Sequence, residues 1–198
     1  PKLIVSASCG IEPGRVVVFG PSQGGHAAAF TVRYAPHYAP ELDIAAAVYE
    51  IPPTDFVAQS QAVLQAGNPS TTQVGNTAIF LRAASDWYEA DLEDALMPGV
   101  AADVEDYVRE NCELASLSGD LEQIFQPGLL EAALEEDFGT YDPFTCFVRE
   151  NSVVDTSVPR LDDVPALFVT AENDTLVNTE VERASFLKLC EQGMRMVY

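Results

Sequence analysis

The sequence predicts an α/β fold in which a parallel sheet is flanked by helices and interrupted by a helical insertion. Two short apolar runs, at 16–19 and 42–49, lie on either side of a segment rich in small residues, and a third run follows at 164–171. Strands that alternate with helices in this order are joined by right-handed crossovers into a parallel sheet.

The first strand is predicted at 16–19, where a β-branched run lies between Pro13-Gly14 and Gly20. Such a run is typical of a strand buried on both faces. The glycines and alanines of 23–34 then predict a helix that packs closely on the sheet. The next strand is predicted at 42–49, and it is stopped by two prolines at 52–53.

An acidic segment with helical periodicity fills 54–163, with breaks at 67–69, 98–99, 127–128 and 142–143. We therefore expect three parts, namely a sheet core at 1–53, a helical cap at 54–163 and a return to the core at 164–198. The last part should contain a strand at 164–171, a helix from about 179 to 192 that ends at Gly193, and the start of a further strand.

Composition limits the possible partners. Lys and Arg number 10 against 31 Asp and Glu, and a formal charge of -21 argues against binding to nucleic acid or to an anionic membrane. A neutral or cationic ligand is easier to accommodate. No apolar run is long enough to span a membrane, and the amino end lacks the pattern of a signal peptide.

The four cysteines are too widely spaced for a metal or redox site of the CxxC type, and no cluster of His and carboxylates has metal-ligand spacing. We expect neither a metal nor another cofactor. Cys112 and Cys146 could pair as a disulfide, and four buried thiols are the alternative.

The strongest motif is Gly20-Pro21-Ser22-Gln23-Gly24, which matches G-x-S-x-G directly between a predicted strand and a predicted helix. This corner holds a serine in a strained conformation, and Gly20 and Gly24 avoid collisions around it. The backbone N–H of Gln23, at the start of the helix, can hold an oxyanion. The alternatives are a structural turn and a phosphate loop, although the lysine of a phosphate loop is missing.

The stretches GPSQGGHAAAF and YAPHYAPELDIAAAVYEIPPTDF resemble the secretory lipases of the α/β-hydrolase superfamily. The resemblance covers 16–56 strongly and 164–193 well, and it covers the cap only in general character. It implies an incomplete α/β-hydrolase fold with an inserted helical cap, a serine carboxylic ester hydrolase acting on lipid or other small esters, and a secreted protein. One departure is Pro21, where the family usually carries His or Tyr.

The acid of a catalytic triad is predicted at Asp174, on the loop after the strand at 164–171, where it matches the family's acid. It would orient a histidine and stabilise the imidazolium. Glu172 is the second candidate, and a carboxylate that only caps a turn is the structural alternative. A glycosylation sequon at 173–175 is discounted, because a glycan there would block the chemistry.

No suitable base is found. Both histidines of the chain, His26 and His37, precede the acid. We expect His26 one helical turn below Ser22 and directed away from it, and His37 in a proline-rich turn. In this fold the base would follow the next strand, and only fifteen residues precede Val16. We therefore expect this chain to be an internal piece of a longer hydrolase. Without a base, the piece alone should be inactive.

Two questions about function stay open at this point. The same machinery could serve a peptidase or an acyltransferase, and the missing histidine favours an alternative in which a non-catalytic hydrolase-fold protein acts as a binding module. Apolar residues of the predicted cap could line an acyl pocket or form the core of the cap itself: Phe80, Trp87, Phe125, Leu129 and Leu130.

Overall fold

The computed structural model describes residues 14–110, 117, 120–135 and 141–198. The chain forms two compact units. The first unit contains the sheet and comprises 1–54, 157–173 and 182–198, and the second unit is helical and comprises 55–156 and 174–181. The predicted divisions fell after residues 53 and 163, whereas the units divide after Thr54 and Thr156 and assign 174–181 to the helical unit.

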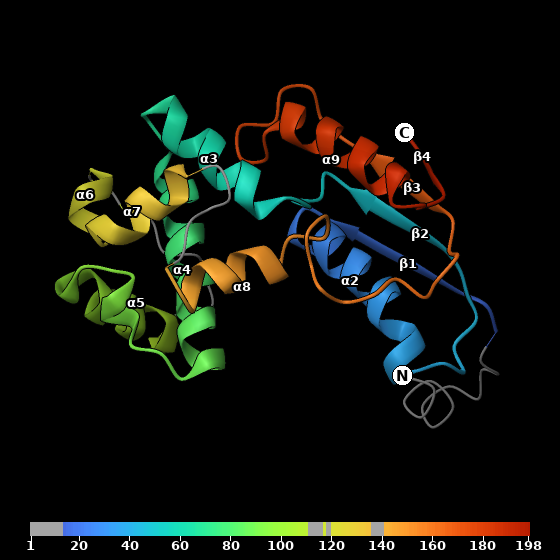
Figure 1. The fold of residues 1–198 in the computed structure, drawn as a ribbon, viewed down its shortest axis with the longest axis horizontal. Helices are drawn as coiled ribbons and strands as arrows, with labels where there is room; N and C mark the ends of the chain where they lie inside the picture. The colour runs from blue at the N-terminus through green and yellow to red at the C-terminus, as the bar shows by residue number, and fades with distance from the viewer. Residues whose placement is uncertain (1–13, 111–116, 118–119, 136–140) are drawn as a thin grey trace. The chain divides into compact units, whose positions relative to one another are not determined.

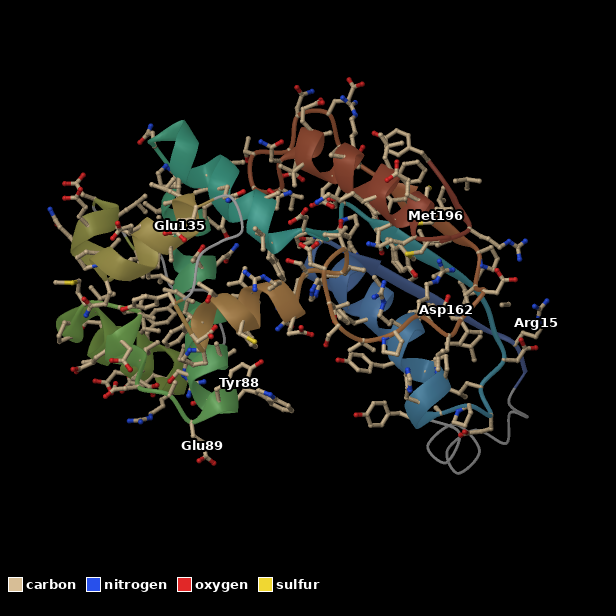
Figure 2. All side chains as sticks on the ribbon, in the orientation of Figure 1. Arg15, Tyr88, Glu89, Glu135, Asp162 and Met196 are labelled. Atoms are coloured by element: carbon tan, nitrogen blue, oxygen red, sulfur yellow. The ribbon has the colours of Figure 1, made fainter. Side chains whose placement is uncertain are left out.

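The first unit is built on a four-stranded parallel sheet whose strands lie side by side in chain order (Figure 1). The parallel pairing confirms the parallel sheet expected from the sequence. The strands are β1 (Val16–Pro21), β2 (Ile44–Glu50), β3 (Ala166–Val169) and β4 (Met196–Val197). At the start of β1, Arg15 forms an ion pair of 3.1 Å with Asp43, the residue before β2 (Figure 2).

Two helices cover one face of this sheet, α2 (Gln23–Tyr38) and α9 (Thr179–Glu191). Tyr49 and Phe168 are register partners and therefore point to the same face. The ring of Phe168 packs on Phe186 of α9, with centroids 5.6 Å apart, and Tyr49 lies near Arg33 of α2. Both Tyr49 and Phe168 are buried.

The opposite face of the sheet carries apolar side chains that remain exposed. Val17 and Phe19 of β1 are 59% and 61% exposed, and Val197 of β4 is 64% exposed. The sequence predicted strands buried on both faces, and this is wrong for the described residues because α2 and α9 cover only one face. Interior strands of parallel sheets carry apolar residues on both sides.

Charged side chains lie around the buried Arg33 of α2. Arg33 is 6% exposed and donates to the backbone carbonyl of Val158 at 3.1 Å. Desolvation by burial lowers the pKa of Arg33, and the nearby Asp162 carboxylate opposes that effect. Asp162 also pairs with Arg160 at 3.3 Å (Figure 2). Arg33 lies in α2, whereas Val158 and Asp162 lie far along the chain. Their contacts with Arg33 hold the 157–163 segment against α2.

The second unit consists of helices with a core of its own. Its buried centre includes Leu81, Val104, Phe125, Leu129 and Phe144. A smaller group contains Phe80, whose ring centroid lies 4.8 Å from that of Phe56 and 4.5 Å from that of Phe147. The elements are α3 (Phe56–Ala66), α4 (Thr71–Tyr88), η1 (Leu92–Asp94), α5 (Pro98–Glu110), α6 (Leu121–Ile124), α7 (Pro127–Leu134) and α8 (Phe144–Glu150).

The ends of these helices follow local chemistry. Gly67 ends α3 in the left-handed conformation, with φ of 68°, and Ser70 and Gln73 form a capping box that starts α4. Pro98 and Pro127 are the first residues of α5 and α7, where a missing N–H costs nothing. The predicted breaks therefore coincide with helix ends and helix starts.

The apolar residues considered for an acyl pocket have different surroundings. Phe125 and Leu129 belong to the core of the second unit, and Leu130 packs against it. Trp87 is 78% exposed. Of the cysteines, Cys146 and Cys190 are free thiols, whereas Cys112, the other half of the possible disulfide, lies outside the described residues.

Candidate active site

The site begins at the corner between β1 and α2. Ser22 is exposed and has a strained backbone, with φ of 52° and ψ of -121°, as the corner motif predicts. Its N–H donates to the carbonyl of Glu50 at 2.8 Å, and its carbonyl accepts from the N–H groups of Gly25 and His26 at 2.8 and 3.2 Å. A non-glycine residue in such a conformation costs about 1–3 kcal/mol and needs support from its surroundings.

Close backbone approaches explain the glycines around Ser22. A Cβ at position 20 would stand 2.0 Å from the carbonyl oxygen of Gly24, so no side chain fits there. A Cβ at position 24 would meet only the Cδ of Pro21, at 3.3 Å. The tighter helix position is Gly25, where the carbonyl oxygens of Gly20 and Glu50 would both lie 3.0 Å from an added Cβ.

The small residues of 23–34, Gly25 among them, predicted a helix that packs closely on the sheet, and the close approach at Gly25 agrees with this prediction. With no Cβ at Gly25, the first turn of α2 can approach the carboxyl ends of both β1 and β2. The helix start is thereby held close to Ser22.

The amide of Gln23 is the first of α2. The first amides of a helix have no acceptor within the helix, and the helix dipole makes this end electropositive. The N–H of Ser22 already donates to the carbonyl of Glu50. The N–H of Gln23 is therefore the next main-chain donor along the sequence that can donate to an anion beside the Ser22 hydroxyl.

Asp174 lies in the second unit, on the loop that leads from β3 to α9. One carboxylate oxygen, Oδ1, accepts from the N–H groups of Leu176 and Val177 at 2.8 and 2.9 Å. These bonds fix the orientation of the carboxylate and leave Oδ2 without a protein partner among the described residues. The second candidate, Glu172, is exposed and lies 3.8 Å from Arg183.

Ser22 and Asp174 both follow strands of the same parallel sheet, whose carboxyl ends meet at one edge. Ser22 belongs to the first unit and Asp174 to the second. Their pairing in one triad is therefore part of the proposal below.

The histidines lie on α2. The ring of His26 packs edge-on against Phe30, with centroids 4.9 Å apart. His37 was predicted in a turn, which is wrong, because α2 continues through Pro36 to Tyr38 and His37 lies in its last turn. A proline removes only one helical hydrogen bond, and the i,i+4 contact between Tyr34 and Tyr38, with centroids 5.9 Å apart, supports the extra turn.

The described residues contain no group of three or more His, Cys, Asp or Glu side chains arranged to hold a metal ion. No helix in the same ranges is both long enough and apolar enough to cross a membrane.

Comparison with known proteins identifies the family. The model of the secretory lipase family matches residues 3–198, which include the serine corner and the Asp174 loop. This chain belongs to the secretory lipase family. No curated protein matches its sequence.

Solved structures share the fold of this chain. A variant of the rice cell wall degrading esterase LipA from Xanthomonas oryzae is similar with a TM-score of 0.72 and 19% identity, over 98% of this chain and 53% of that one. Candida antarctica lipase A is similar with a TM-score of 0.65 and 15% identity, over 98% of this chain and 44% of that one. This chain thus spans about half the length of the structures it matches and has part of an α/β-hydrolase fold.

Proposed function

We propose that this chain carries the nucleophile and the acid of a serine carboxylic ester hydrolase of the lipase or esterase type. The observation that carries the proposal is the strained, exposed Ser22 at a corner where Gly20 leaves no room for a side chain. Strain of this kind is found where it presents a reactive group. Membership of the secretory lipase family and the esterase and lipase neighbours support the same class of reaction.

In the proposed reaction, the Ser22 hydroxyl oxygen attacks the ester carbonyl carbon while a histidine removes its proton. The N–H of Gln23 donates to the oxyanion of the tetrahedral intermediate. The imidazolium then returns the proton to the departing alcohol, which leaves an acyl-serine. Water, deprotonated by the same histidine, attacks this ester and releases the carboxylic acid and the free serine. Asp174 orients the histidine and stabilises its charged form.

The base is assigned outside this chain. His26 and His37 both precede Asp174, whereas the base of an α/β-hydrolase follows the acid in the sequence. Loss of one triad member costs about 10⁴-fold or more in rate, so the 198-residue chain alone would be nearly inert. The helical unit would serve as the cap, the substrate would be a lipid or other small ester, and the protein would act outside the cell.

A fluorophosphonate probe tests the assignment in the full-length protein that carries this chain. The probe should label Ser22, and Ser22→Ala should abolish labelling. Ser157→Ala is the control, because Ser157 is also exposed and lies in the first unit but is not at a strand-to-helix corner. We expect Asp174→Asn to reduce ester hydrolysis by about 10⁴-fold. Labelling that survives in Ser22→Ala would refute the assignment.

The second candidate function is a non-catalytic hydrolase-fold protein that acts as a binding module, and the position of both histidines before the acid favours it. The two functions differ in one measurable property. A binding module would not react with the fluorophosphonate probe at Ser22 even as the full-length protein, and a hydrolase would.

A further inference from the structure

A side chain of the helical unit holds the main chain of the acid loop. Gln59, in α3, is 8% exposed, and both ends of its amide contact the backbone of Asn178. Its Oε1 accepts from the N–H of Asn178 at 2.9 Å, and its Nε2 donates to the carbonyl of the same residue at 3.2 Å. The side-chain amide of Gln59 thus bonds both the N–H and the carbonyl of Asn178, as the backbone of a neighbouring β-strand would.

Asn178 connects this pair to the carboxylate. Four residues earlier, Asp174 accepts from the N–H groups of Leu176 and Val177 through Oδ1. On its other side, the Asn178 side chain accepts from the N–H groups of Glu180 and Val181 at 3.0 and 3.2 Å. The loop is therefore held by hydrogen bonds between residues close in sequence. The pair of bonds from Gln59, which we call the tether, links this loop to a distant part of the sequence.

The tether starts from a well-fixed point. Asp55 caps α3 by accepting from the N–H of Ala58 at 2.9 Å, and the N–H of Gln59 donates to the carbonyl of Asp55 at 2.9 Å. The N–H of Phe56 donates to Ser152 at 3.0 Å. A group on a capped helix is positioned more accurately than a group on a loop.

We propose that Gln59 is a positioning residue for the triad acid: by binding the backbone of Asn178, it sets where Asp174 presents its carboxylate. This inference rests on the proposed function, in which Asp174 orients the catalytic histidine. A misplacement of about 1 Å at such a group can cost about 100-fold in rate even when the altered residue is far from the reacting atoms.

Two substitutions separate positioning from general stability. Gln59→Leu removes both hydrogen bonds. Gln59→Glu keeps the shape and the acceptor, but its carboxylate cannot donate to the carbonyl of Asn178 unless it is protonated. The activity of Gln59→Glu relative to the parent should therefore rise as the pH falls, which loss of packing alone would not produce.

The chain offers a matched control two residues along the same helix. Gln61 also donates from Nε2 to a backbone carbonyl, that of Glu135, at 2.6 Å. It lies in α3 like Gln59, but its acceptor follows α7 rather than β3. Gln61→Leu removes a bond of the same kind without touching the acid loop.

The experiment uses the full-length protein with a p-nitrophenyl ester as substrate, together with amide hydrogen exchange at Leu176, Val177 and Asn178. We expect Gln59→Leu to lower kcat by about 10- to 100-fold, with KM changed by less than about twofold. Exchange at the three amides should accelerate. Gln61→Leu should keep both the kcat and the exchange rates of the parent.

Three results would overturn the inference. The first is a Gln59→Leu variant with the parent's kcat in a protein that Asp174→Asn inactivates, which leaves the proposed function standing. The second is unchanged exchange at the three amides, which counts against the tether even if Ser22 proves not to be the nucleophile. A Gln59→Glu variant without pH-dependent recovery would also contradict the inference.

Discussion

Replacement of Gly20 by alanine should damage both stability and reactivity. The added Cβ would stand 2.0 Å from the carbonyl oxygen of Gly24 and 2.2 Å from its carbonyl carbon. Favourable contacts between non-bonded heavy atoms begin at about 3.5 Å, so the strand end and the first turn of α2 must separate by about 1 Å or more. Both atoms belong to the backbone, and no change of rotamer can relieve the contact.

We expect Gly20→Ala to lower the free energy of unfolding by about 3 kcal/mol, at the upper end of the range for overpacked sites. A shift of about 1 Å at Ser22 should also slow fluorophosphonate labelling by about 100-fold. Urea denaturation measures the first effect, and the rate of labelling in the folded protein measures the second.

The matched control is Gly99→Ala, in the first turn of α5. A Cβ at Gly99 would meet nothing within 4 Å, and its φ is not positive, so this variant should gain up to about 1 kcal/mol from helix propensity. A Gly20→Ala protein as stable as the parent, and labelled at the same rate, would show that the close approach of Gly24 does not constrain the corner.

Two further predictions concern buried polar groups. Thr54 and Glu182 are fully buried, and the Thr54 hydroxyl is hydrogen-bonded to Glu182. Thr54→Val should therefore lower the free energy of unfolding in urea by about 1.5–3 kcal/mol, whereas Thr54→Ser should keep most of the parent's stability. Tyr49→Phe should raise the free energy of unfolding by about 1 kcal/mol, because the buried Tyr49 hydroxyl has no hydrogen-bond partner among the described residues. Burial also raises the pKa of Tyr49, so the folded state keeps a proton that the unfolded state releases above about pH 10. The parent should therefore lose stability as the pH rises past that value, and a melting series from neutral to alkaline pH should show a smaller loss for Tyr49→Phe.

Local sequence patterns were sufficient for the sheet core and the corner. The β-branched run before Gly20 becomes β1, the apolar run before the two prolines becomes β2, and Gly193 ends α9 with φ of 87°. Periodicity and glycine placement act over a few residues, which is the range that a single sequence reveals.

Contacts between distant segments could not be predicted in this way. Gln59 and Asn178 are 119 positions apart, and Thr54 and Glu182 are 128 apart. Gln59 and Glu182 are both polar residues of helices, where the usual expectation is an exposed side chain. Their partners become visible only when the fold brings the segments together, so no local signal marked either residue.

A second strained residue strengthens the assignment of function to the edge of the sheet that bears Ser22. Ile51, directly after β2, has φ of 42°, which is exceptional for a β-branched residue. Its N–H donates to the carbonyl of Val169 at the end of β3, just as the N–H of Ser22 donates to Glu50 at the end of β2. Each strained residue is thus held by a backbone bond to the next strand. Backbone strain thus recurs at one edge of the sheet and is supported in the same way both times. Such strain costs free energy that a simple turn does not need. It is expected where a fold keeps reactive groups in fixed positions.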